Sequence, residues 1–134
     1  MTILSHRYLG NLLPDMTGDS LPCFHTVTYV TLSLTWQVTH YRFSISWSRV
    51  LPDGTLRSKN PAGVQYYHNL IDALVAAGIT PMITLYHWDL PNELQKAGGW
   101  LVESIVPLFR DYADLCFSEY GDKMRWCGIK TLSS

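Results

Sequence analysis

The chain has 134 residues, of which 47% are hydrophobic and 16% charged, as is typical of a globular domain. Ten basic and eleven acidic residues give a formal net charge of −1, which gives no reason to expect nucleic acid or an anionic membrane as a partner. Three cysteines without CxxC spacing and five histidines without HxH or HxxxH pairing predict neither a disulfide framework nor a metal centre. We also expect no cofactor, because neither GxGxxG nor GxxxxGK[ST] occurs.

The first residues lack the apolar core of a signal peptide, and no apolar run is long enough to span a bilayer. These absences predict a cytoplasmic protein by default, with no membrane segment in this chain. A secreted or membrane-bound parent protein stays open, because the chain need not begin where the full protein begins.

Residues 1–38 differ in pattern from the rest of the chain. Apolar and polar residues alternate strictly over residues 30–38, which predicts a strand. The phase slips at Thr39-His40, so residues 30–47 are not expected to form one flat strand.

After residue 40 the apolar pattern is regular. We predict a strand over residues 41–47 and a second over residues 80–87. Between them lies a helix that Asn60 caps, that has Pro61 at its first position, and that Gly78 ends in a left-handed conformation.

A second long helix follows Gly98-Gly99. Its buried face is expected to carry Ile105, Phe109, Tyr112, Cys116 and Tyr120. Gly121 would close this helix, and residues 123–126 resemble the start of a third strand.

The alternation of strand and helix predicts an α/β fold with right-handed crossovers and a parallel sheet. Three strands cannot close a barrel, since a complete (β/α)₈ barrel takes ~250 residues. The chain is therefore either a small open α/β domain or part of a barrel. In such an open arc, residues 30–38 are the expected cover for one sheet edge.

Functional residues of parallel α/β folds lie at the carboxyl ends of the strands. The second predicted strand ends in Tyr86-His87-Trp88-Asp89. An indole beside polar groups suits a sugar, whose C–H face packs on the ring. For Asp89 we favour the role of N-cap of a short helix over residues 90–96.

Arg42 shares a strand face with Ser44 and Ser46, opposite Phe43 and Ile45. If the latter two contact the helices, Arg42 points into the barrel and needs a carboxylate partner there. The alternative, a surface arginine near the start of the strand, stays open.

Four segments resemble family 1 glycoside hydrolases, and their sequences are most similar to those of lactase-like and cytosolic β-glucosidase members. They are residues 41–54, YRFSISWSRVLPDG, residues 83–91, ITLYHWDLP, residues 98–100, GGW, and residues 109–114, FRDYAD. The resemblance covers about residues 40–126. It implies a partial (β/α)₈ TIM barrel, open and incomplete, that contains strands 2–4 and helices 2–3 of the family.

The resemblance also implies retaining hydrolysis of β-glucosides or β-galactosides. In the family, the positions that match His87 and Trp88 hydrogen-bond the sugar at the cleavage site. The position of Arg42 matches the arginine beneath the nucleophile, where its charge keeps that carboxylate ionised.

Both ends depart from the family pattern. No Asn-Glu-Pro follows Trp126, and no Glu-Asn-Gly occurs, so the motifs of the two catalytic glutamates are absent. We expect residues 1–38 and 127–134 to be divergent segments around a family core at 39–126. Since retaining hydrolysis needs two carboxyl groups about 5–5.5 Å apart, we expect no catalytic residue and no activity from this chain alone. A non-catalytic, klotho-like binding or regulatory fragment is the alternative, and a product that does not fold stably is a third.

Overall fold

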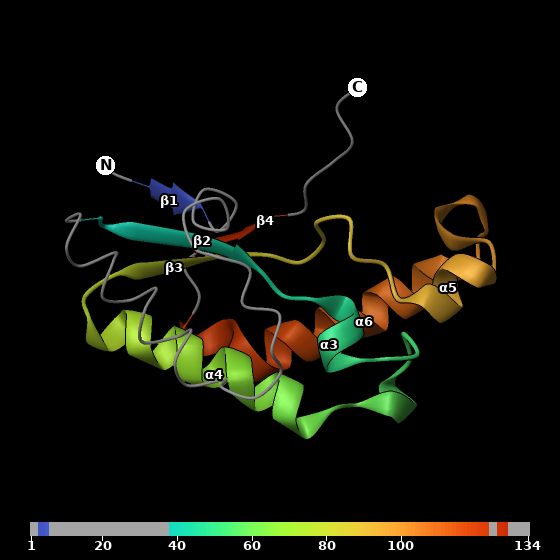
Figure 1. Cartoon of the computed structure of the whole chain (residues 1–134), viewed down its shortest axis with the longest axis horizontal. Helices are drawn as coiled ribbons and strands as arrows, with labels where there is room; N and C mark the ends of the chain where they lie inside the picture. The colour runs from blue at the N-terminus through green and yellow to red at the C-terminus, as the bar shows by residue number, and fades with distance from the viewer. Residues whose placement is uncertain (1–2, 6–37, 124–125, 129–134) are drawn as a thin grey trace, which may run out of the picture.

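The computed structural model describes residues 3–5, 38–123 and 126–128. Four parallel strands form one sheet in the order β1-β2-β3-β4: β1 (Ile3–Ser5), β2 (His40–Ser44), β3 (Thr80–Thr84) and β4 (Trp126–Gly128). Helices α4 (Pro61–Ala76) and α6 (Ile105–Tyr120) both lie along one side of this sheet (Figure 1). The predicted α/β fold with parallel strands is therefore confirmed.

Shorter elements connect these units. Two are α-helical, α3 (Trp47–Val50) and α5 (Asn92–Lys96). Three are 3₁₀ turns: η1 (Leu56–Ser58), η2 (Gly99–Leu101) and η3 (Gly121–Lys123). No helix in the described ranges is both long and apolar enough to cross a membrane.

The register of the sheet brings the carboxyl ends of β2 and β3 together. The two strands pair from His40 with Thr80 to Ser44 with Thr84. One further backbone bond, from the Ile45 N–H to the Thr84 oxygen at 3.0 Å, extends the ladder past Ser44. The loops that follow both strands therefore start at the same edge of the sheet.

The core lies between the sheet and its two long helices. Along β2, buried Tyr41 and Phe43 alternate with half-exposed neighbours, and the Phe43 ring stacks on Tyr67 of α4 at 6.2 Å. Burial of this apolar face drives the packing. The buried residues of the two long helices are Gly63, Val64, Tyr67, Leu70, Ile71 and Leu74 in α4, and Ile105, Tyr112, Cys116 and Tyr120 in α6.

Two features fix the long helices, one at the strand ends and one at α3. The buried Tyr112 hydroxyl lies 3.0 Å from the Ile45 oxygen and 2.8 Å from the Leu85 oxygen, so α6 holds the ends of β2 and β3 at once. Gly63 lets α4 approach α3, because a Cβ atom at this position would overlap the backbone oxygen of Arg49.

The helix boundaries largely match the prediction. Pro61 is the first residue of α4, and Gly78 follows its end with φ 72°, the left-handed conformation expected of it. Asn60 is the N-cap residue, but its side chain makes no cap bond and instead donates to the Arg49 oxygen at 3.0 Å. The predicted face of α6 is buried except for Phe109, which is half-buried.

The predicted strands were too long at their carboxyl ends. β2 ends at Ser44 and β3 at Thr84, not at residues 47 and 87. The apolar alternation continues because Ile45 and Trp47 are both buried, but the Ser46 N–H donates to the Tyr67 hydroxyl at 2.8 Å instead of a strand. The backbone then turns into α3.

The other end of the sheet also differs from the prediction. The strand that pairs with β2 at this edge is β1, which was not predicted. Of residues 30–38, the expected cover for one edge, only Val38 lies within the described residues. The last strand begins at Trp126, since Lys123 belongs to the turn η3.

Candidate functional site

Arg42 lies on the sheet face opposite the helices. Its neighbours Tyr41 and Phe43 are buried under α4, and successive side chains of a strand point to opposite faces. Its Nε donates a 3.1 Å hydrogen bond to the Thr84 hydroxyl, and Thr84 is only 2% exposed. The structure therefore places the guanidinium group on the side of the sheet away from α4 and α6, next to the carboxyl end of β3.

The bond to Thr84 engages only one nitrogen of this guanidinium group. Within residues 38–123, no ion pair includes Arg42. A positive charge on this face of the sheet, fixed by a neighbouring strand, is suited to hold an anionic group above the sheet.

The loop after β3 presents an indole at the same edge. Trp88 has φ 71°, a left-handed conformation that is unusual for a bulky residue, and its side chain is 62% exposed. His87, just before it, is half-buried. Backbone strain of this kind concentrates at functional sites. The loop therefore combines an exposed aromatic face with an imidazole.

Asp89 shapes this loop and does not cap a helix. Its Oδ1 accepts the His87 backbone N–H at 3.2 Å, whereas α5 begins at Asn92 with Pro91 at the N-cap position. The N-cap prediction for Asp89 was therefore wrong. This bond to a backbone N–H that precedes it engages the carboxylate within the loop and away from the start of α5.

An aromatic cluster supports the loop from below. The Trp100 Nε1 donates to the Tyr86 hydroxyl at 3.0 Å, and the two rings lie edge to face at 4.9 Å. Trp47 contacts Trp100 at 6.4 Å and stacks on Tyr112 at 4.8 Å. Sequence reasoning missed this role of Trp100; the preceding Gly98-Gly99, which lets η2 turn back toward the loop, was the available signal.

The two acids that follow β3 have separate partners. Asp89 accepts the His87 N–H, and Glu93 pairs with Lys96 at 2.8 Å. No group of three potential metal ligands occurs in the part of the chain that the structure describes.

These features define one class of protein. Parallel strands, helices on one face, and polar and aromatic residues at the carboxyl ends are the arrangement found in part of a (β/α)₈ barrel enzyme. The model of the family described as "Glycosyl hydrolase family 1" matches residues 15–130, a wider range than the 39–126 core expected from the motifs. The chain belongs to glycosyl hydrolase family 1.

Individual relatives agree with this family. The chain is 60% identical over 121 residues to lactase/phlorizin hydrolase of Homo sapiens, with 90% of this chain and 6% of that protein covered. It is 51% identical over 90 residues to Klotho of Mus musculus, with 66% of this chain and 9% of that protein covered.

A solved structure extends the agreement to the fold. The β-glucosidase from Thermotoga maritima in complex with glucoimidazole superposes with a TM-score of 0.76 at 39% identity. The match covers 82% of this chain and 25% of that one. The chain thus spans a small part of the proteins it matches, and its strands belong to part of a (β/α)₈ barrel.

Proposed function

We propose that this chain forms part of the sugar-binding wall of a retaining β-glycosidase of the β-glucosidase type. In this proposal β2, β3 and β4 are strands 2–4 of the family barrel, and the substrate is a β-glucoside or β-galactoside. The observation that carries the proposal is the position of Arg42, which Thr84 holds on the face of the sheet opposite α4 and α6.

Arg42, His87 and Trp88 have distinct roles in the proposed hydrolysis. A retaining glycosidase needs one ionised carboxylate as nucleophile and one carboxylic acid as proton donor, about 5–5.5 Å apart. The charge of Arg42 favours the ionised form of a carboxylate placed above it. His87 supplies a hydrogen bond to the sugar, and the exposed indole of Trp88 supplies both an N–H and a ring face for it.

We further propose that the 134 residues alone do not hydrolyse glycosides, because neither Asn-Glu-Pro nor Glu-Asn-Gly occurs in them. The purified chain is expected to show no turnover of p-nitrophenyl β-D-glucoside or β-D-galactoside. Turnover that survives purification and disappears in a His87→Ala variant would contradict this.

Sugar binding by the chain can be tested without activity. In an NMR titration with deoxynojirimycin, we expect the Trp88 indole signal and the His87 amide signal to shift. The indole of Trp47, which is 0% exposed, is the internal control and should stay in place. If all tryptophan signals shift equally, or none does, the assignment of the sugar contacts is wrong.

A second candidate is a non-catalytic binding or regulatory protein, which the 51% identity to Klotho favours. The sequence of the full-length parent protein distinguishes the two candidates. A parent transcript that contains both Asn-Glu-Pro and Glu-Asn-Gly supports the enzyme, and one that lacks both supports the second candidate.

A further inference from the structure

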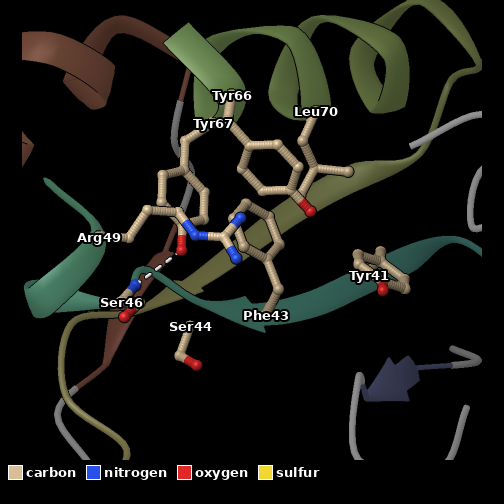
Figure 2. Close-up of a pocket in the computed structure, with 8 residues that line it drawn as sticks. All are labelled: Tyr41, Phe43, Ser44, Ser46, Arg49, Tyr66, Tyr67 and Leu70. Atoms are coloured by element: carbon tan, nitrogen blue, oxygen red, sulfur yellow. Dashed lines mark hydrogen bonds between the residues drawn. The ribbon is translucent and has the colours of Figure 1, made fainter. Parts of the chain in front are cut away.

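A polar hollow lies on the helix side of the sheet, away from the site that Arg42 marks. Its volume is about 180 Å³, and Tyr41, Phe43, Ser44, Ser46, Arg49, Tyr66, Tyr67 and Leu70 line it. We call it the Arg49 pocket. Figure 2 shows Arg49 reaching over its middle from α3, with Tyr66 and Tyr67 above it on α4. Ser44 is directed away from these rings, so it contributes little beyond its backbone.

Arg49 gives the pocket a positive charge. Its guanidinium carbon lies 4.6 Å from the centroid of the Tyr66 ring, a cation–π contact that orients the group without using its N–H donors. No carboxylate within residues 38–123 forms an ion pair with it. None of the eight described residues that line the pocket is acidic. The guanidinium group is therefore available to a carboxylate, which it can bind through two parallel hydrogen bonds.

Tyr67 adds a second donor beside this charge. Its hydroxyl oxygen accepts the Ser46 N–H at 2.8 Å, so its own hydrogen remains for another acceptor. The pKa of Tyr67 is raised to about 12, chiefly by burial, while the Ser46 bond and the charge of Arg49 oppose this shift. The phenol thus stays protonated at neutral pH, and its pKa registers the nearby guanidinium group.

The aromatic rings of the lining pack against one another. The Phe43 ring stacks on Tyr67, and the Tyr66 ring meets Tyr67 edge to face at 5.1 Å. Phe43 is 4% and Leu70 4% exposed, so these walls belong to the packed core. The volume lies below the range of pockets for drug-sized molecules, ~300–1,000 Å³, which limits the ligand to a small molecule.

We propose that the Arg49 pocket binds a small organic carboxylate, with Arg49 and the Tyr67 hydroxyl as donors to the anion and the rings of Phe43 and Tyr66 against its apolar body. This site is independent of the proposed glycosidase function, because it lies on the opposite face of the sheet from Arg42.

Benzoate is the probe, and the full 134-residue chain is the protein. In an NMR titration at pH 7, benzoate should shift the Arg49 Nε–H signal and the Ser46 amide signal in a saturable manner. Neutral benzamide, which has the same ring without the charge, should bind at least about tenfold more weakly, since hydrogen bonds to charged groups are the stronger ones. Equal affinity for the two compounds overturns the proposal.

Substitutions complete the test. Arg49→Gln should weaken benzoate binding about tenfold or more, whereas Arg57→Gln should change it less than about twofold. Arg57 is the matched control, because it is exposed and lies outside the pocket. Its substitution removes the same charge as that of Arg49. Should Arg49→Gln fail to fold, the wild-type titration still decides: no saturable shift at Arg49 and Ser46, or equal shifts at Arg57, contradicts the proposal.

Discussion

Replacing Tyr112 with phenylalanine tests how α6 holds the ends of β2 and β3. The substitution keeps the ring that stacks on Trp47 and removes only the hydroxyl that contacts the Ile45 and Leu85 oxygens. Leaving a buried polar group without its partner costs about 1–3 kcal/mol. Burial raises the pKa of the Tyr112 phenol, so the hydroxyl remains a donor at every pH of the assay.

Urea unfolding followed by tryptophan fluorescence measures this cost. With a urea dependence of about 2 kcal/mol per M, a loss of about 2 kcal/mol lowers the unfolding midpoint by about 1 M. Tyr66→Phe is the matched control, because Tyr66 is only half-buried and its hydroxyl makes no hydrogen bond within residues 38–123. It should change the free energy of unfolding by less than about 0.5 kcal/mol. Equal midpoints for the two variants would refute the role assigned to the Tyr112 hydroxyl.

Two further substitutions test the packing and the charges of the helices. Gly63→Ala should lower the free energy of unfolding by about 1–3 kcal/mol, because the added Cβ overlaps the backbone of α3. The control Gly121→Ala should be neutral, because its added Cβ meets no atom within 4 Å. Equal unfolding midpoints in urea for the two variants would contradict this. Hydrogen bonds from Lys59 and His68 lower the pKa of Glu119 in the folded state below its unfolded-state value of 4.5. The ionised Glu119 therefore stabilises the fold fully above pH 4.5, and this stabilisation is lost as pH falls through the lower folded-state pKa. Glu119→Gln should therefore be less stable than wild type at pH 7, by less than about 1 kcal/mol, and this difference should shrink as pH falls below 4.5; a difference that grows with acidification would show the opposite linkage.

The order of the elements could be predicted from the sequence, but the strand ends could not. Apolar spacing places α4 and α6 correctly, because their buried faces follow the helical period. Ile45 and Trp47 continue the strand alternation beyond Ser44 because the turn into α3 also buries them. The pairing of β1 with β2 depends on contacts between residues far apart in sequence, and three residues carry too little pattern to reveal it.

The candidate site shows the same division. The alternation of β2 put Arg42 on the face opposite Phe43 but left a surface arginine as an alternative, and its bond to Thr84 needed the strand register. Asp89 has the local signature of a helix cap, but its carboxylate accepts the His87 N–H two residues earlier, and α5 begins only at Asn92. The Arg49 pocket has no sequence signature, because it forms only where α3 packs beside α4.

The most direct test of the sugar-binding wall is a graft. Residues 40–123 of this chain would replace the matching segment of the Thermotoga maritima β-glucosidase, to which the chain is 39% identical. Hydrolysis of p-nitrophenyl β-D-glucoside is then measured as kcat/KM for the graft and for its Arg42→Ala and Asp89→Asn variants, at equal folded fraction. Arg42→Ala should lower kcat/KM about a hundredfold or more, because the nucleophile loses the charge that stabilises it, and Asp89→Asn should have a much smaller effect. Comparable losses in both variants, or an active graft that tolerates Arg42→Ala, would contradict the proposal that this strand edge serves β-glycoside hydrolysis.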